Sequence, residues 1–103
     1  MWNGKRVSIV FPAYNEEENI ARAVEDFLAT GWVDEVVVVD NNSKDRTAAL
    51  ARDAGGRVIP ETKQGYGHAL RRGLREAIGD YILLCEPDGT FVATDLLKFF
   101  AYA

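Results

Sequence analysis

Two acidic residues follow an apolar run near the C-terminal end of the sequence, with a proline between them. Glu86 and Asp88 flank Pro87, and residues 81–85 before them are a tyrosine, three aliphatic residues and a cysteine. Two carboxylates at this spacing can bind a hard divalent cation, and such a cation can bind a diphosphate. This segment therefore predicts a metal site for a nucleotide, while a tight turn at Asp88 and Gly89 is the structural alternative.

Strand-like and helix-like segments alternate along the sequence. β-Branched and aromatic residues mark short strands at residues 7–11, 36–39, 57–59 and 81–85. Helical patterns lie between them, at about residues 16–30, 45–54 and 67–78, and a last one starts at residue 95. Asn15 is expected to cap the first helix, and Gly79 to end the third. This order predicts an α/β fold, a three-layer α/β/α sandwich around a mainly parallel, Rossmann-like sheet of about four strands.

Polar residues follow each of the four predicted strands. The segments are residues 12–16, 40–43, 60–61 and 86–88. Because ligands of parallel α/β sheets bind beyond the carboxyl ends of the strands, these segments should form one site. Tyr14 could stack on a nucleobase, with packing against the sheet edge as the alternative. Asp40 could bind a base, or else cap the turn after its strand. Turn and cap roles explain the neighbouring residues about as well as ligand roles do: Asn42, Ser43 and Asp45.

The loop before the third helix contains two glycines, and the N-terminus of that helix could receive phosphate oxygens. Gln64 and Gly65 are the candidate nucleotide-binding residues of this loop, and a flexible loop is the alternative. His68 is better explained as an ordinary histidine than as a catalytic base. Arg71 and Arg72 could neutralise a phosphate, but a solvated helix face explains them better.

Length and composition exclude several classes of protein. A chain of 103 residues is at most one small domain, and a net charge of −4 argues against a nucleic-acid partner. One cysteine allows no internal disulfide, no apolar stretch reaches the length of a membrane span, and the cytoplasm is the expected compartment. The sequence has no G-x-G-x-x-G after its first strand, no P-loop, no Cys/His cluster for zinc and no nucleophile elbow. A metal-dependent nucleotide site outside these classes remains.

Four segments carry a family resemblance by their residues, order and spacing: residues 12–17, 39–47, 64–73 and 79–88. They resemble the family 2 glycosyltransferases of the GT-A fold, and look closest to the branch similar to dolichyl-phosphate mannose synthase. The resemblance implies a nucleotide-diphospho-sugar donor, a UDP- or GDP-sugar, and a divalent metal, Mg²⁺ or Mn²⁺. It also implies that a hexose is transferred with inversion to an acceptor hydroxyl or a lipid phosphate.

The resemblance also implies roles for the strand-end residues. Those that would line the base and ribose are Pro12, Ala13, Tyr14 and Glu16. Asp40 would hydrogen-bond the base. Glu86 would face the ribose, the diphosphate and the metal, and Asp88 would be the stronger metal ligand. Glu86 stands where the family pattern has an aspartate, and its longer side chain should alter the geometry around a metal.

In the family, the catalytic base and the acceptor site lie in a second half, beyond the position of Ala103. Residues 1–103 are therefore expected to be a single N-terminal half domain that binds the donor and lacks the base. A reading of a different class is a non-catalytic nucleotide-binding or self-associating fragment, a homo-oligomer formed through an exposed sheet edge or the last helix. A phosphoacceptor receiver domain with Asp40 as acceptor would need a lysine after a fifth strand, and the sequence has no fifth strand.

Overall fold

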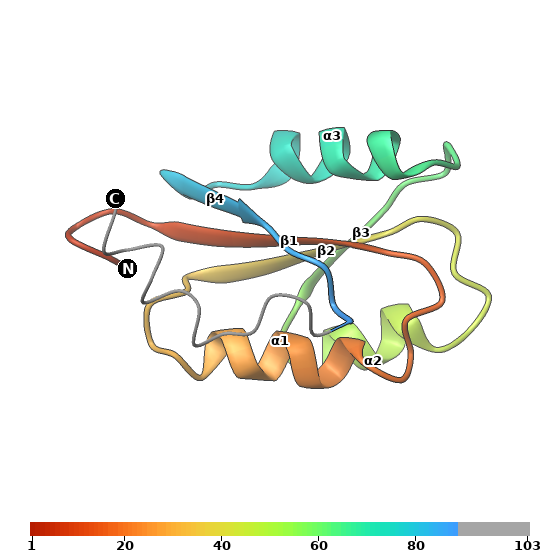
Figure 1. Ribbon diagram of the computed structural model, residues 1–103, viewed down its shortest axis with the longest axis horizontal. Helices are drawn as coiled ribbons and strands as arrows, with labels where there is room; N and C mark the ends of the chain where they lie inside the picture. Colours follow the sequence, from red (N-terminus) through yellow and green to blue (C-terminus); the bar gives the residue numbers. More distant parts are fainter. Residues whose placement is uncertain (89–103) are drawn as a thin grey trace.

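The computed structural model describes residues 1–88, which form an α/β fold of three layers (Figure 1). The strands are β1 (Val7–Ala13), β2 (Glu35–Asp40), β3 (Arg57–Pro60) and β4 (Tyr81–Leu84). The helices are α1 (Ile20–Leu28), α2 (Thr47–Asp53) and α3 (Tyr66–Glu76). Figure 1 shows α1 and α2 on one face of the sheet and α3 on the other. The predicted fold class is confirmed, and the helix predicted from residue 95 lies outside the described residues.

The sheet has the strand order β3-β2-β1-β4, and each neighbouring pair is parallel. In the central strand β1, Val10 lies opposite Val37 on one side and Leu84 on the other. The register extends to the strand ends, where Ala13 lies opposite Asp40. Because all the strands run in the same direction, the loops that leave their carboxyl ends meet at one edge of the sheet.

Alternate residues of the central strands face the two helical layers. Phe11 is fully buried on the side of α1, where it contacts Phe27 edge to face at a centroid distance of 5.6 Å. Val10 and Val37 lie in the other layer, with Ala69 of α3. Both faces of these strands are thus buried, which explains why the valine run at residues 36–39 shows no polar alternation.

Helix α3 lies close to the sheet because two small residues, Ala69 and Gly73, are buried against it. A Cβ atom at Gly73 would lie 2.3 Å from Cγ1 of Val10 and 3.2 Å from Cγ2 of Val39. A larger residue at this position would therefore push the helix away from β1 and β2. The helix starts at the carboxyl edge of the sheet, immediately after Gly65, whose φ angle is 135°.

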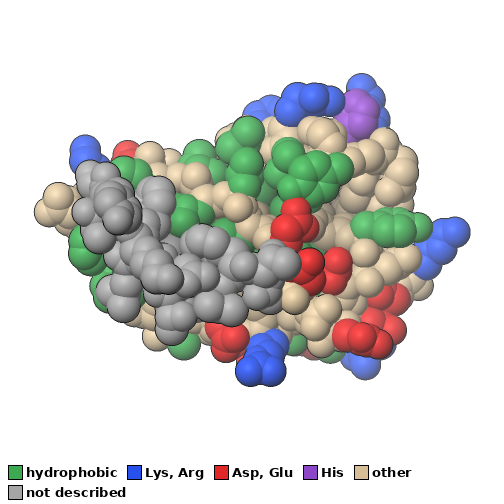
Figure 2. All heavy atoms as spheres, viewed as in Figure 1, with side chains coloured by type: hydrophobic (Ala, Val, Ile, Leu, Met, Phe, Trp, Pro, Cys, Tyr) green, Lys and Arg blue, Asp and Glu red, His purple; other side chains and the backbone are tan. Residues whose placement is uncertain are grey.

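Strand β4 is at an edge of the sheet in the described part of the chain, and its surroundings are apolar. Leu84 in this strand is 45% exposed, and Leu74 and Ile78 are also exposed. Figure 2 shows apolar side chains grouped on this face of the molecule, between the positions of α3 and β4. An open strand edge beside exposed apolar side chains favours association with another chain or segment.

The predicted start of the first helix is wrong. Asn15 has a φ angle of 52°, and its side-chain oxygen accepts a hydrogen bond from the N–H of Lys44. Helix α1 begins only at Ile20, after a turn in which the carbonyl of Glu16 accepts the N–H groups of Asn19 and Ile20. The side chain of Asn15 is thus used to join two loops, so it does not cap the helix.

Polar contacts join the segments at the edge of the sheet where the strands begin. Helix α3 also ends earlier than predicted. The buried Ser8 hydroxyl donates to Glu35 at 2.6 Å and accepts the N–H of Gly79 at 2.8 Å. Burial raises the pKa of Glu35, but hydrogen bonds from the Ile78 N–H and Ser8, together with the charge of Arg57, lower it below 4.5 overall. Helix α3 ends at Glu76, where the backbone of Ala77 becomes extended with a ψ angle of 137°, so Gly79 is not the residue that ends the helix.

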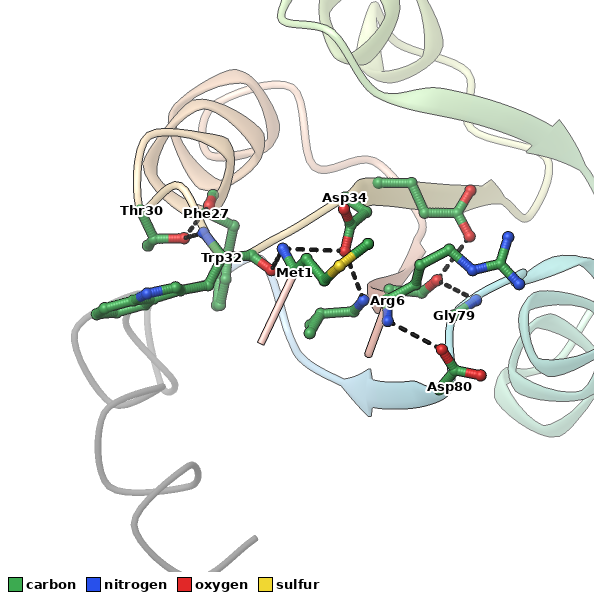
Figure 3. Close-up of polar contacts among 11 residues, drawn as sticks. Met1, Arg6, Phe27, Thr30, Trp32, Asp34, Gly79 and Asp80 are labelled. Carbon is green, nitrogen blue, oxygen red and sulfur yellow. Dashed lines mark hydrogen bonds and ion pairs between the residues drawn. The ribbon is translucent and has the colours of Figure 1, made fainter. Parts of the chain in front are cut away.

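The N-terminus is held at the same edge (Figure 3). The amino group of Met1 donates to the carbonyl of Trp32 at 2.7 Å and lies 3.2 Å from the carboxylate of Asp34. The same carboxylate accepts the N–H of Val7 at 2.7 Å, and this hydrogen bond is the main reason that the pKa of Asp34 is lowered. The acidic side chains at this edge thus accept hydrogen bonds from other parts of the chain and stabilise the fold.

Candidate functional site

The structure places the predicted site residues at the carboxyl edge of the sheet, where the loops after the four strands meet. Pro12 and Ala13 are buried residues of β1, whereas Tyr14, which follows them, is 47% exposed. Glu86 is half-buried and Asp88 is exposed. Figure 2 shows acidic side chains grouped near the middle of the face of the molecule that is in view. A ligand at this edge would therefore meet an aromatic ring and carboxylates above a buried apolar floor.

Reciprocal hydrogen bonds join the loop after β1 to the loop after β2. The N–H of Asn15 donates to the hydroxyl of Ser43 at 2.9 Å, and the Asn15 side chain accepts the N–H of Lys44 at 2.9 Å. One residue further on, the N–H of Glu16 donates to the hydroxyl of Thr47 at 2.8 Å. The two loops are thus one unit, and the Ser43 hydroxyl joins them, which is neither the ligand role nor the turn or cap role predicted for it.

Asp40 and Asp45 also use carboxylate oxygens within these loops. Oδ1 of Asp40 accepts the N–H of Ser43 at 3.1 Å, which closes the turn after β2. Asp45 accepts the N–H of Thr47, the first residue of α2, at 3.0 Å. For both residues, the contacts expected from a turn or cap role are present. Asp40 also lies half-buried at the strand end, within the candidate site.

Asn41 is a residue that the sequence reasoning missed. It is 4% exposed, and its side-chain nitrogen donates to the carbonyls of Glu61 and Lys63, each at 2.9 Å. Its side-chain oxygen accepts the N–H of Gly65 at 2.9 Å and the amide of Gln64 at 3.3 Å. The asparagine therefore holds the loop before α3 against the end of β2, with its amide group fully used. Its position directly after a strand marks it as a candidate residue, but the sequence does not predict its partners, which are 20 to 24 residues away.

The predicted nucleotide-binding residues Gln64 and Gly65 are thus part of a fixed loop. The side-chain nitrogen of Asn42, a residue with a φ angle of 67°, donates to the side-chain oxygen of Gln64 at 2.9 Å and to the carbonyl of Thr62 at 3.0 Å. Both the oxygen and the nitrogen of the Gln64 side-chain amide are therefore hydrogen-bonded. The flexible-loop alternative does not describe this segment, because side chains from the end of β2 fix it.

Carboxylates of separate loops act electrostatically on Glu16 at this edge. Burial raises the pKa of Glu16, a hydrogen bond with Asn19 opposes this change, and the negative charges of Asp88 and Glu86 raise the pKa further. Like charges this near to one another repel unless a cation lies among them. The resemblance assigned Glu16 to the base and ribose, while the parallel strand order predicted that its segment would meet residues 86–88 at one edge.

Tyr66 joins the acid group of Glu16, Glu86 and Asp88 to the start of α3. Its hydroxyl donates to Oε1 of Glu86 at 2.6 Å, and this hydrogen bond is the main reason that the pKa of Tyr66 is raised. The ring is 57% exposed, so the contact is made at the surface of the site. Glu86 is therefore oriented by a residue of another element. Its neighbour Cys85 is buried, which raises the pKa of the thiol to about 12 and makes it a poor metal ligand.

The donor set suits a hard cation that is shared with a ligand. Within residues 1–88, no three or more side chains of histidine, cysteine, aspartate or glutamate are grouped so that they could hold a metal ion by themselves. Mg²⁺ is typically bound by one or two carboxylates, with water and substrate phosphates completing its shell. Glu86 and Asp88 supply oxygen donors of this kind, so the site residues fit a metal bound together with a diphosphate.

The fold is Rossmann-like, with four parallel strands alternating with three helices in the described residues. Residues 8–103 match the model of glycosyl transferase family 2, and the chain belongs to this family. This membership sets the receiver-domain alternative aside. Within the described residues, no helix has the length and apolar character needed to cross a membrane.

Particular relatives include glycosyltransferase AglJ of Haloferax volcanii, which is 40% identical over 93 residues. That match covers 89% of this chain and 30% of AglJ. Protein RfbJ of Shigella flexneri is 33% identical over 94 residues, which are 91% of this chain and 73% of RfbJ.

Among solved structures, glucosyl-3-phosphoglycerate synthase from Mycobacterium tuberculosis has the GT-A-like fold of this chain. The TM-score is 0.75 at 32% identity, over 82% of this chain and 34% of the synthase. That synthase was solved with Mn²⁺, UDP and glucosyl-3-phosphoglycerate, and in another crystal with Mg²⁺ and UDP. The chain thus spans about a third of the length of AglJ and of the synthase.

Proposed function

We propose that this chain is the donor-binding half of an inverting glycosyltransferase and that its carboxyl-edge site binds a nucleotide-diphospho-sugar with Mg²⁺ or Mn²⁺. The observation that carries the proposal is that the loops after four parallel strands meet at one edge of the sheet, where Glu16 feels the charges of Glu86 and Asp88 and Tyr14 is exposed. The complexes of the related synthase with UDP-glucose and Mn²⁺ support it.

Each side of the site has a proposed role. Asp88 and Glu86 hold the cation, and a bound cation would neutralise charge on the diphosphate as it leaves. The ring of Tyr14 stacks on the base, which Asp40 hydrogen-bonds with the carboxylate oxygen that does not close its turn. Glu16 faces the ribose. The remaining nucleotide-binding residues of the proposal line the floor and the start of α3: Pro12, Ala13, Gln64 and Gly65.

The proposal extends to the reaction of the complete enzyme. A hexose is transferred with inversion to an acceptor hydroxyl or a lipid phosphate, and the base that activates the acceptor lies beyond residue 103. Assignment to the branch similar to dolichyl-phosphate mannose synthase stays a prediction, as does the choice between UDP and GDP.

Calorimetric titration of the chain with UDP and with GDP, with and without Mn²⁺, tests the donor site. We expect weak binding that requires the metal, and no sugar transfer from UDP- or GDP-sugars. Asp88→Asn should weaken binding in Mn²⁺ by about tenfold or more, because each lost charged contact costs about 1.5–3 kcal/mol. Asp26→Asn is the matched control, since Asp26 is an exposed residue of α1 that pairs with Arg22. Binding that ignores the metal, or a full loss in the control, would contradict the site.

A second candidate function is self-association, in which the chain is a non-catalytic nucleotide-binding or assembling fragment. The observation that favours it is that the apolar group of Leu74, Ile78 and Leu84 is exposed, with Leu84 in β4, an edge strand of the described residues. Such an edge can pair with the same edge of a second copy. The two candidates are compatible, because the apolar group contains none of the proposed donor-site residues.

A further inference from the structure

A second polar cavity lies away from the acid group, between the loop after β3 and the outer side of α3. Its volume is about 380 Å³. The residues that line it are Glu61, Lys63, His68, Arg71, Arg72 and Arg75. Four cationic side chains thus face one carboxylate, in a chain whose net charge is −4. Figure 2 shows basic side chains grouped on the side of the molecule where α3 lies in Figure 1.

The geometry of α3 brings these basic residues together. His68, Arg71 and Arg75 recur at helical spacing, so they share one face of the helix. The sheet-facing side of the same helix is taken by Ala69 and Gly73, which are buried. The basic face therefore cannot turn inward, because a charged side chain would then replace the small residues that contact the sheet.

The loop side of the cavity is equally fixed. Lys63 follows Glu61, whose carboxylate accepts the N–H of Lys63 at 3.1 Å. The carbonyls of both residues accept hydrogen bonds from the buried side chain of Asn41. The cavity is thus built from a helix packed on the sheet and a loop tied to a strand end, and it does not depend on a free surface loop.

The cations of the cavity are only partly compensated. Arg72 lies 3.3 Å from Glu76 and 4.0 Å from Glu61, so its charge is balanced within the protein. In the described part of the chain, three cations form no ion pair with a carboxylate: Lys63, Arg71 and Arg75. The cavity therefore carries a net excess of positive charge.

The contact between Arg71 and His68 adds an imidazole N–H donor to these charges. Nη2 of Arg71 lies 3.2 Å from Nδ1 of His68. Because arginine can only donate, Nδ1 must accept, and the histidine then carries its proton on Nε2. The pair thus supplies one positive charge and an additional N–H donor.

We propose that this basic cavity binds a phosphate monoester dianion, separately from the nucleotide site. Two guanidinium groups and an ammonium group match a dianion with three acceptor oxygens, and arginine binds phosphate in a bidentate manner. The volume lies at the small end of the range for ligand sites, about 300–1,000 Å³, which suits a compact group. A long polyanion would instead meet the repulsion of an acidic chain.

Titration calorimetry with inorganic phosphate and with glycerol 3-phosphate, in EDTA so that no metal is present, tests the cavity. We expect saturable binding that weakens at least about tenfold in the double variant Arg71→Gln and Arg75→Gln, because two charge-assisted contacts are lost. The double variant Arg22→Gln and Arg52→Gln is the matched control, since it removes the same charge from α1 and α2. The control and Asp88→Asn should both retain wild-type affinity. Lys63→Gln, on the loop, should also weaken binding.

Vesicles distinguish the two sources of such a phosphate. If phosphatidylcholine vesicles that contain phosphatidic acid compete with inorganic phosphate, and pure phosphatidylcholine vesicles do not, the ligand is a lipid headgroup. If neither kind of vesicle competes, the ligand is a soluble phosphate ester. The proposal is overturned if no phosphate probe binds saturably, or if the control pair loses as much affinity as the α3 pair. Loss of metal-dependent UDP binding in Asp88→Asn would not affect it.

Discussion

At the scale of single residues, Glu86 is the position where the start of α3 meets the acid group. Its carboxylate accepts the hydroxyl of Tyr66 at 2.6 Å while it lies near Glu16. A side chain that hydrogen-bonds a metal-binding carboxylate orients it and limits its movement. Glu86 is also the longer of the two acids around Pro87, so it has more rotamers to lose on binding a cation. A tyrosine that reduces this freedom compensates for the extra methylene.

Tyr66→Phe is therefore expected to weaken the binding of Mn²⁺ and UDP by about tenfold, the lower end of the 10–100-fold effect of such supporting contacts. Folding stability should change little, because the ring is 57% exposed. Calorimetry gives the first quantity and urea denaturation the second. Tyr14→Phe is the matched control, since a stacking ring does not need its hydroxyl. Equal affinities for wild type and Tyr66→Phe would show that the tyrosine does not position Glu86.

At the scale of elements, one glycine, Gly73, allows α3 to pack closely on the sheet. The effect of this packing on stability can be distinguished from the general destabilisation of a helix by glycine. A Cβ at Gly73 would lie 2.3 Å from Val10, whereas a Cβ at Gly67 would lie 3.6 Å from the mobile end of Arg71. Gly73→Ala should destabilise the chain by about 1–3 kcal/mol through overpacking. Gly67→Ala should stabilise it by about 0.4–1 kcal/mol, because alanine loses less backbone entropy.

Urea denaturation of both variants measures these free energies. The same substitution in the same helix should shift the midpoint in opposite directions, which a uniform propensity effect cannot do. If Gly73→Ala were as stable as the wild type, the close packing of α3 on β1 would be wrong. Such a result would also weaken the argument that the basic face of α3 is held outward.

Local sequence patterns predicted the elements of this fold better than their ends. Four consecutive valines are decisive for β2, since burial on both faces suppresses alternation. The same parallel order predicted that the strand ends share one edge. Asn15 was misassigned because its partner, Lys44, lies 29 residues away in the chain. Asn41 was missed for the same reason, because its partners lie 20 to 24 residues away. These contacts depend on which loops the fold brings together, and no local spacing encodes them.

At the scale of the whole molecule, the described residues form a sheet with one strongly apolar border. Leu84 of β4 is 45% exposed, and Leu74 of α3 and Ile78, which follows α3, are exposed as well. Within residues 1–88, β4 has no strand on its outer side, and exposed apolar side chains are costly to leave in water, so a second copy can cover this border. The acidic net charge of −4 opposes association at low ionic strength. The balance of these two effects makes self-association dependent on concentration and favoured by salt.

Sedimentation velocity at several concentrations and two salt concentrations checks this expectation. The wild-type chain should shift from monomer toward dimer as concentration and salt rise. Leu84→Lys should remain monomeric, because a charged edge strand resists pairing with a copy of itself. Ala29→Lys is the matched control, since it adds the same charge at an exposed position at the end of α1 and should associate like the wild type. A wild-type chain that stays monomeric at all concentrations would contradict the self-association function. It would not contradict the proposals for the donor site and the phosphate cavity.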